Sequence, residues 1–382
     1  MPYASDAYAA FCAQAEQRGH LRRLNARLDH SARLLDFSHN DYLGFAHHPQ
    51  LIHAAQRAAQ RYGVGATGSR LLSGDSLLAH ALERRIARSK QAPRALVFSS
   101  GYTLNTGVIA ALLDRRVLKD EPAVFCDRLV HASFYHAFAT AGVHPQRYHH
   151  NDLDHLASLL AASQARKCTR FIFTESVFGM DGDCAPIDEL RSLARRYDAL
   201  LYIDEAHATG LHGPEGSGLA SGVVQDGGIA MGTFSKALGG SGAYLACNEG
   251  IASFLLQRCG SLIYSTAAAP ATLASALTAW RLLPHYGNVR RATLERATQL
   301  RAQLRELGFD VGKSTTHILP LIFSNLERAL TVHAHLAEHG IRTSLIRPPT
   351  VPPNAIRLRL AISANHDDSA IAALVSALRA FQ

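Results

Sequence analysis

The sequence predicts an α/β protein with a large domain built on a mostly parallel sheet and a smaller C-terminal α+β domain. Between residues 93 and 246, short apolar runs alternate with segments long enough for helices. Strands that are apolar along their whole length are typical of parallel sheets covered by helices on both faces. A chain of 382 residues can also bury more than one core. The apolar runs are RALVF, PAVFC, RFIFTE, ALLYIDE, GIAMGTF and GAYLAC.

The flanking segments complete this assignment in chain order. Residues 1–35 have the pattern of an amphipathic helix, and LLDFSHNDYLGF (34–45) indicates a short strand and a turn. Residues 49–62 show helical spacing with a proline near the start. A helix is expected within 264–283, and AIRLRLAIS (355–363) alternates as a strand does. We therefore expect an N-terminal helical arm with a short strand at 1–45, a large domain at 46–285 and a small domain at 286–382.

Composition narrows the classes of function. The net charge is +8, but the basic residues are spread along the chain, so we expect attraction for an anionic substrate or an acidic protein partner and no nucleic-acid partner. No apolar stretch reaches the roughly 20 residues that span a bilayer, and the N-terminus lacks a signal-peptide pattern. The six scattered cysteines predict reduced thiols in the cytoplasm and no metal site. The pairs His47–His48 and His149–His150 are expected at the surface.

Two motifs of nucleotide-binding proteins lack the context they need. GVGATG (63–68) matches G-x-G-x-x-G, but a helix-like segment precedes it, so a glycine loop is the better interpretation. DEAH (204–207) is the signature of one class of nucleic-acid helicases. The nearest match to their phosphate loop, GFDVGKST (308–315), is one residue short between the glycines and follows DEAH. A helicase is the alternative from a different class, and ATP hydrolysis by the purified chain would favour it.

Lys236 is the most unusual residue, within GTFSKALGGSG (232–242). Of the 39 Lys and Arg residues, only five are lysines. An ammonium group can lose its proton and become a nucleophile, whereas a guanidinium stays charged. A lysine between an apolar strand and a glycine cluster is therefore a candidate for covalent catalysis. A solvated lysine after a strand is the ordinary alternative.

Other polar residues follow the predicted strands, at the edge where α/β sheets bind ligands. Each alone has an ordinary explanation, such as a helix cap, a turn or a surface histidine. Together they offer a helix N-terminus for a phosphate, a flat ring, a carboxylate and an amine nucleophile, which suits pyridoxal 5'-phosphate (PLP). They are Ser100, Gly101 and Tyr102 after RALVF, His131 after PAVFCD, Asp204 and His207 at the end of ALLYID, and Thr233 before Lys236.

These segments resemble the α-oxoamine synthase family of fold-type-I PLP-dependent enzymes over almost the whole chain. The resemblance implies an aspartate aminotransferase-like fold with a seven-stranded sheet, PLP as cofactor and a homodimer with a shared active site. The matching segments, in the family's order, are FSHNDYLG (37–44), GSRLLSG (68–74), FSSGYTLN (98–105), DRLVHAS (127–133), TESVFGMDGDCAPI (174–187), DEAHATG (204–210), TFSKALGGSG (233–242), IYST (263–266) and IRPPTVP (346–352).

The resemblance also implies roles for individual residues. Lys236 would carry the cofactor as a Schiff base, and Asp204 would pair with the pyridinium nitrogen. His207 would contact the phenolic oxygen, and His131 would stack on the ring. The phosphate would be held by Ser100, Gly101, Tyr102 and Thr233, with Ser265 and Thr266 from a second subunit. The substrate contacts would be Arg22 or the adjacent Arg23, Asn40, His131, Thr350 and Arg359.

Gly179 stands where the family commonly has a serine that contacts the phenolic oxygen. The absence of this serine implies that the Schiff base of the cofactor is tuned more weakly, without loss of function, because a neutral hydrogen bond contributes only about 0.5–1.5 kcal/mol.

Arg357 and Arg359 share one face of the predicted strand. Arg359 would suit bidentate binding of a carboxylate, but two solvent-facing arginines would give the same pattern.

The IRPPTVP segment (346–352) and the arginine-rich strand favour one activity of the family, the decarboxylating condensation of L-alanine with a pimeloyl thioester in biotin biosynthesis. The acyl donor would be pimeloyl-CoA or a pimeloyl carrier protein. The freed amine of Lys236 would remove the α-proton of alanine. Glycine C-acetyltransferase, 5-aminolevulinate synthase and serine palmitoyltransferase share the core chemistry, so the acyl chain length stays open.

Overall fold

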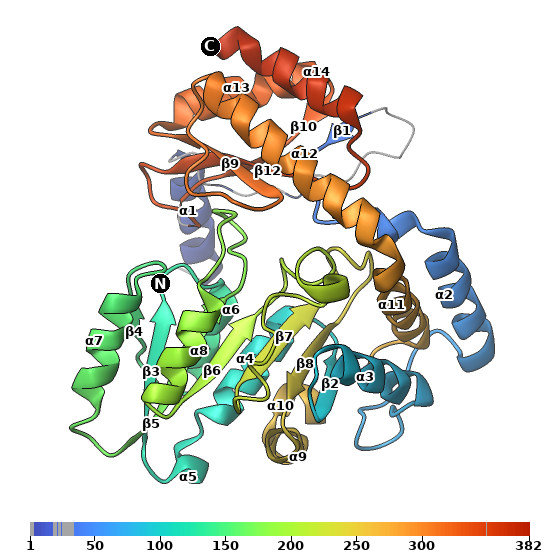
Figure 1. Cartoon of the computed structure of the whole chain (residues 1–382), viewed down its shortest axis with the longest axis vertical. Helices are drawn as coiled ribbons and strands as arrows, with labels where there is room; N and C mark the ends of the chain where they lie inside the picture. The colour runs from blue at the N-terminus through green and yellow to red at the C-terminus, as the bar shows by residue number, and fades with distance from the viewer. Residues whose placement is uncertain (1–3, 18–20, 22–23, 25–33, 349) are drawn as a thin grey trace.

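The computed structural model describes residues 4–17, 21, 24, 34–348 and 350–382, and the described residues from 34 onward form two lobes (Figure 1). The larger lobe contains a sheet of seven strands: β2 (Arg94–Phe98), β3 (Glu121–Asp127), β4 (Gln146–Tyr148), β5 (Cys168–Glu175), β6 (Ala199–Asp204), β7 (Ile229–Thr233) and β8 (Ala243–Cys247). Their order across the sheet is β2-β8-β7-β6-β5-β3-β4. Only β8 runs antiparallel to its neighbours, which confirms the predicted mostly parallel, seven-stranded sheet.

Helices cover both faces of this sheet. Along β5, Phe171 and Phe173 pack into one apolar core, and Ile172 between them packs into another on the opposite face. This double burial explains why the strands read as continuous apolar runs. The helices of this lobe are α2 (Pro49–Tyr62), α3 (Leu77–Ser89), α4 (Gly101–Leu112), α5 (Arg115–Leu118), α6 (Ala132–Thr140), α7 (Leu153–Ser163), α8 (Ile187–Arg196), α9 (Glu249–Arg258), α10 (Gly260–Ile263) and α11 (Pro270–Leu282).

The smaller lobe has a core of its own, made by an antiparallel sheet and three helices. Its sheet has the order β11-β12-β9, from β9 (Ile318–Phe323), β11 (Ser344–Ile346) and β12 (Ile356–Ala361). The helices are α12 (Gly287–Glu306), α13 (Leu326–Glu338) and α14 (Asp368–Leu378). In addition β1 (Leu35–Asp36) pairs with β10 (Ile341–Arg342), and Phe37 is buried in this core. The short strand β1 and the residue after it are therefore attached to the smaller lobe.

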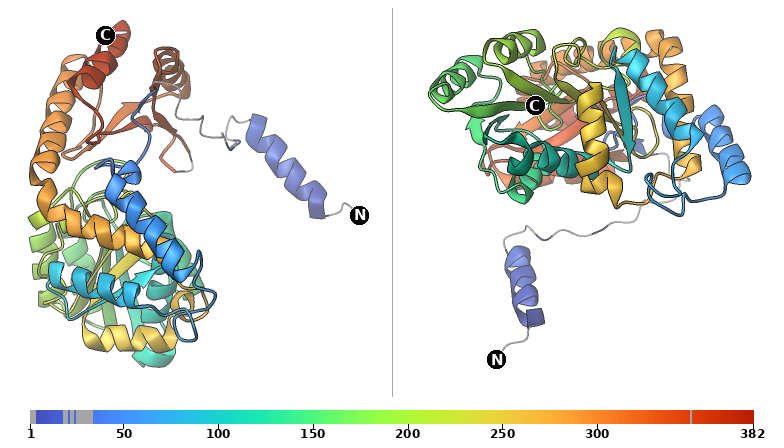
Figure 2. Two further views of the ribbon diagram at one scale, coloured as in Figure 1. Left: turned by 90° about the vertical axis from the view of Figure 1, so that its right-hand side faces the viewer. Right: turned by 90° about the horizontal axis from the view of Figure 1, so that it is seen from below.

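Short elements and α1 complete the description. Helix α1 (Ala4–Gln17) stands away from both lobes, as Figure 2 shows, and almost all of its residues are exposed. The 3-10 turns are η1 (Phe45–His47), η2 (Pro214–Gly216), η3 (Leu283–Tyr286) and η4 (Arg379–Phe381). Within the described residues, no helix has the length and apolar character needed to cross a membrane.

Most predicted elements have the expected type. The helix expected at 49–62 is α2, and GVGATG (63–68) is a loop. Helix α4 begins at Gly101, within the segment predicted to form a helix N-terminus, and Ser100 caps it by accepting a hydrogen bond from the Thr103 amide. Strand β4 was not predicted, since its three residues at the sheet edge form no apolar run.

A buried ion pair fastens the loop after β6 to the large lobe. The side chain of Glu205 is fully buried, and the Lys90 ammonium at the end of α3 contacts both its carboxylate and the Ser217 carbonyl. The Ala220 amide donates a further hydrogen bond to Glu205 at 2.7 Å. Because this loop leads directly from Asp204, the ion pair supports the edge of the sheet where the site lies.

We expect Lys90→Met to lower the free energy of unfolding by about 3–5 kcal/mol, because it leaves the Glu205 carboxylate buried without a cation. Arg94→Met is the matched control: Arg94 pairs with Glu249, but their side chains are 40 % and 61 % exposed, so this change should cost at most about 1 kcal/mol. Chemical denaturation of both variants measures the difference. Equal losses would contradict a special role for the buried pair.

Candidate active site

Lys236, Asp204 and His207 meet at the carboxyl ends of β6 and β7. Asp204 is the last residue of β6, and Lys236 follows the end of β7 by three residues. The Nζ atom of Lys236 lies 2.7 Å from Nε2 of His207. Burial lowers the pKa of the Lys236 ammonium to about 8, although Asp204 and Glu175 act in the opposite direction. The amine can therefore lose its proton close to neutral pH.

A chain of hydrogen bonds continues from Lys236 through His207 to Tyr42. The Tyr42 hydroxyl lies 2.7 Å from Nδ1 of His207, donates to Oδ1 of Asn40 at 3.0 Å and accepts from Nη2 of Arg359 at 3.2 Å. Because the hydroxyl donates its one proton to Asn40, it accepts from His207, so Nδ1 carries the imidazole proton. Nε2 is then the acceptor for Lys236.

The charge state of His207 agrees with this assignment. Burial, the Lys236 ammonium and the Arg359 guanidinium all lower its pKa, which falls well below the ordinary value. A neutral imidazole with its proton on Nδ1 can only accept at Nε2. The chain of hydrogen bonds from Tyr42 through His207 thus holds the Lys236 amine in one orientation, toward the interior of the site.

Asp204 is oriented by hydrogen bonds from neighbouring polar groups. Asn105 donates to its Oδ2 atom at 2.9 Å, and the Ala206 amide donates to Oδ1 at 2.8 Å. Asn105 is itself fixed by the Tyr202 hydroxyl at 2.7 Å. Across the part of the chain that the structure describes, no Lys, Arg or His forms an ion pair with Asp204, which is buried. A buried carboxylate of this kind suits a cationic ligand group.

Glu175 is a second carboxyl group of the site that the sequence interpretation missed. It ends β5 and is the direct neighbour of Asp204 across the sheet. Burial is the main reason that its pKa rises to about 8, and the Asp204 carboxylate adds to the effect. The backbone amides of His131 and Gly179 donate to it. The rule that selected Asp204, a polar residue at the end of an apolar strand, would also have found Glu175 in RFIFTE.

The N-terminus of α4 lies beside the end of β7. A Cβ atom on Gly101 would lie 3.9 Å from Cβ of Thr233, so these two predicted residues are neighbours. The Thr233 hydroxyl donates to the Gly242 carbonyl at 2.8 Å, and Ser100 caps the helix. Free amides at a helix N-terminus, with hydroxyl groups beside them, can hold a phosphate. Tyr102, the next residue of the helix, is partly exposed.

His131 caps α6 and lies near both Asp204 and the start of α4. Its Nδ1 atom accepts from the Ser133 amide at the start of α6, and burial lowers its pKa. The edge of its ring faces the Tyr102 ring, with 6.4 Å between the centroids. His131 therefore borders the same space as Tyr102 and Asp204.

Some predicted residues are not brought to this centre. Ser265 and Thr266 lie next to Ser99, and Thr266 bridges to Ser69. Thr350 is exposed, and its amide donates to the Arg347 carbonyl. Arg22 and Arg23 are outside the described residues.

The two arginines of β12 are buried, so the solvent-facing alternative is wrong. Each retains only 4 % of its exposed surface. Arg359 donates from Nε to the Gly179 carbonyl at 2.6 Å, and Arg357 donates to the Asp181 carboxylate at 2.7 Å. These contacts join the smaller lobe to the large lobe beside His207.

Gly179 packs against the His207 ring. A Cβ atom at position 179 would lie 2.3 Å from Nε2 of His207, so the imidazole occupies the space that a side chain would need.

The surface prediction for the histidine pair 149–150 is correct only for His149. The side chain of His150 is only 12 % exposed and lies between two carboxylates, because β4 and the residues after it run along the sheet edge. Among the described residues, His149, Asp152 and His155 bring potential metal ligands within 4.8 Å of one another. Nδ1 of His155 accepts from the His149 amide, and Asp152 caps α7, so this group already has internal partners.

Comparison with known proteins identifies the family. The family model for class I and II aminotransferases matches residues 32–378. A putative 8-amino-7-oxononanoate synthase from Magnetococcus marinus is 44 % identical over 97 % of this chain and 96 % of its own length. The 8-amino-7-oxononanoate synthase from Gluconacetobacter diazotrophicus is 45 % identical over 94 % of this chain and 93 % of its own.

This chain belongs to the 8-amino-7-oxononanoate synthase family, a group of acyltransferases within the class I and II aminotransferase fold. Solved structures agree with this assignment. A serine palmitoyltransferase from Sphingomonas wittichii superposes with a TM-score of 0.91 at 25 % identity, covering 99 % of this chain and 98 % of its own. The 8-amino-7-oxononanoate synthase from Francisella tularensis gives 0.78 at 25 % identity, covering 91 % and 98 %. The predicted fold-type-I architecture is confirmed.

For this family member, we expect Tyr42→Phe to lower the free energy of unfolding by about 1–3 kcal/mol, because Arg359 and His207 each lose a buried acceptor. Chemical denaturation measures the change. Tyr62→Phe is the control, since that ring is 51 % exposed and its hydroxyl can be replaced by water. A Tyr42 variant as stable as the control would show that the chain of hydrogen bonds contributes little.

Proposed function

We propose that this chain condenses L-alanine with a pimeloyl thioester to give 8-amino-7-oxononanoate, with release of CO2 and of the thiol. The observation that carries the proposal is the Lys236 amine, which has a pKa near neutrality and is oriented by His207 in the same site as Asp204. The family assignment supports the choice of this reaction over a simple exchange of amino groups.

PLP is the cofactor, and the residues present fit it. Asp204 offers a buried carboxylate without a cation, which suits a protonated pyridine nitrogen. The start of α4 with Ser100 and Thr233 suits the phosphate, and the Lys236 amine suits the aldehyde. A serine palmitoyltransferase from S. paucimobilis with the same fold has been solved with a PLP–myriocin aldimine. When bound, PLP supplies an electron sink that stabilises negative charge on the α-carbon of the amino acid.

Lys236 acts as the general base in this proposal. Its pKa of about 8 allows the neutral amine to form, and removal of the α-proton then returns the charge to Nζ. His207 keeps the amine directed by accepting its hydrogen bond. Glu175, which shares the buried environment of Asp204 and has a pKa of about 8, holds its proton below that pH and so limits the negative charge beside Asp204.

Arg359 binds the carboxylate of the amino acid in this proposal. Its Nε atom is engaged by the Gly179 carbonyl, and this contact turns the terminal nitrogens toward Tyr42 and the site. Asn40 lies beside them through its hydrogen bond with Tyr42. A planar guanidinium held in this way is suited to a carboxylate, whereas a flexible lysine would need to be ordered on binding.

A homodimer that shares its active sites completes the proposal. Exposed apolar side chains support it, because they lie in two segments joined by the Ser69–Thr266 bridge, and apolar residues gathered on a surface mark interaction sites. Ser265 and Thr266 adjoin the most exposed member of this set, so a second copy could bring them to its partner's phosphate site. The set comprises Val64, Leu71, Leu72, Leu77 and Tyr264.

A cytoplasmic location stays a prediction, supported by six free cysteines.

The test is a panel that pairs alanine, glycine and serine with acetyl, succinyl, pimeloyl and palmitoyl thioesters of CoA and of a carrier protein. We expect kcat/KM for alanine with the pimeloyl donor to exceed that for glycine by at least about tenfold, the usual value of one methyl group in an apolar pocket. Thiol release and CO2 are measured together. Preference for another pair would assign a different α-oxoamine synthase activity, and a spectral change without thiol release would indicate a regulator.

A further inference from the structure

A hairpin formed by residues 176–185 connects the two lobes next to the site. Its base is closed by the bridge between Val177 and Cys184, and the Ser176 amide donates to the Asp204 carbonyl at 2.9 Å. Its tip carries Gly179, whose carbonyl accepts from Arg359 and whose Cα packs against His207. The position of this 176–185 hairpin therefore fixes two groups of the site at once.

The smaller lobe holds one side of the 176–185 hairpin. Arg357 donates to the Met180 carbonyl at 3.1 Å and to the Asp181 carboxylate at 2.7 Å. The amides of Thr315 and Thr316 both donate to the Gly182 carbonyl at 3.0 Å. These contacts alone would let the hairpin follow the smaller lobe if that lobe moved.

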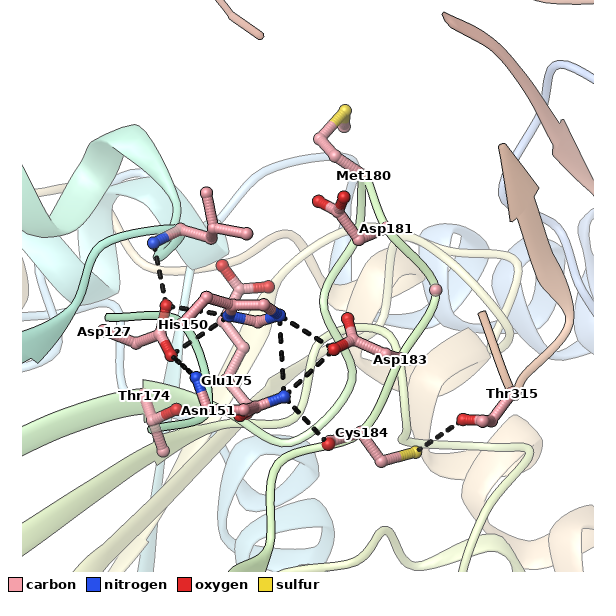
Figure 3. Close-up of polar contacts among 12 residues, drawn as sticks. Asp127, His150, Asn151, Thr174, Glu175, Met180, Asp181, Asp183, Cys184 and Thr315 are labelled. Carbon is pink, nitrogen blue, oxygen red and sulfur yellow. Dashed lines mark hydrogen bonds and ion pairs between the residues drawn. The ribbon is translucent and has the colours of Figure 1, made fainter. Parts of the chain in front are cut away.

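The large lobe holds the other side through His150. Figure 3 shows its ring between the carboxylates of Asp127 and Asp183, with Asn151 beside it. Nδ1 lies 3.0 Å from Oδ1 of Asp127 at the end of β3, and Nε2 lies 2.8 Å from Oδ2 of Asp183 in the hairpin. Asn151 also donates to Asp183 at 3.0 Å and to the Cys184 carbonyl at 3.1 Å. The edge of the His150 ring packs on Phe178, with 4.4 Å between the centroids.

Both ring nitrogens face a carboxylate, which requires the imidazolium form if both are to donate. Burial acts to lower the pKa of His150, but the hydrogen bonds to Asp127 and Asp183 outweigh it and raise the pKa to about 9. At neutral pH the ring therefore joins two anions, one in each element. The other titratable groups nearby are Tyr148, whose pKa is raised by burial, and Cys184.

We propose that His150 is a positioning residue for amino-acid binding: by joining Asp127 to Asp183, it holds the 176–185 hairpin where Gly179 meets Arg359 and His207. The proposal rests on the proposed role of Arg359 in binding the substrate carboxylate. His150 itself touches neither substrate nor cofactor. Its loss leaves the catalytic groups in place but removes the contact that holds Gly179, and Arg359 with it, against His207 of the large lobe.

The experiment compares His150→Gln with His149→Gln in the PLP-loaded enzyme. Glutamine can keep one hydrogen bond but not the charge, and His149 is the adjacent exposed histidine, so the two changes match in chemistry. We expect His150→Gln to weaken alanine binding roughly tenfold, as for a lost hydrogen bond to a charged group, with a smaller change in kcat. Alanine binding is followed by the visible spectrum, without an acyl donor.

Hydrogen exchange of the 176–185 hairpin provides a readout that does not depend on the reaction. We expect faster exchange of its amides in His150→Gln than in the wild type, and wild-type exchange in His149→Gln. Should His150→Gln not fold, Asp183→Asn removes the charge at the other end of the same contact and should give the same two results. If alanine does not bind the wild type, the proposed function fails, and the exchange data still decide whether His150 holds the hairpin.

The pH dependence separates a charged contact from simple packing. Because the folded pKa of about 9 exceeds the ordinary value of about 6.5, the stabilisation is complete below pH 6.5 and is lost as the pH rises through 9. Lys236 and Glu175 titrate in both proteins, so the difference between wild type and His150→Gln isolates His150. We expect this difference in hairpin exchange to vanish by pH 10. Equal exchange and binding in wild type and variant at pH 7, or equal defects in both histidine variants, would overturn the proposal.

Discussion

The removal of the Lys236 ammonium from water is the constraint on which the rest of the site depends. In water a lysine amine is protonated at neutral pH and cannot accept a proton. Burial shifts its pKa to about 8, while the two nearby carboxyl groups oppose that shift. Burial beside Asp204 also raises the pKa of Glu175 to about 8, so its opposition weakens as it takes up a proton below that pH.

A second constraint is that buried polar groups need partners. The site meets it with a continuous set of hydrogen bonds that crosses between the lobes. His207 and Tyr42 connect Lys236 in the large lobe to Arg359 on β12 of the smaller lobe. Arg359 in turn reaches the 176–185 hairpin, whose base is bonded to the backbone of Asp204. The substrate-binding and proton-accepting groups are therefore held by one network, and each lobe contributes part of it.

The sequence predicts much of this arrangement because its signals are local. Apolar runs give the strands of the large sheet, and the residues that follow them give Asp204, His207 and Lys236. Three features were not predicted, and two of them, Tyr42 and His150, depend on tertiary contacts. Tyr42 is far from His207 in sequence, and its segment follows the smaller lobe through the pairing of β1 with β10 and a hydrogen bond from the Ala364 amide to the Tyr42 carbonyl. Glu175 was overlooked at the end of its strand.

His150 is the third feature. The local sequence around a pair of histidines is the same whether both are exposed or one of them is buried between two aspartates.

The central claim, however, concerns Lys236. Borohydride reduction of the PLP-loaded protein, followed by proteolysis and mass spectrometry, tests it directly. The account predicts that the reduced cofactor is found on Lys236, and that Lys236→Ala carries no such modification. A label on Lys90 or Lys313, or full turnover by Lys236→Ala, would contradict it.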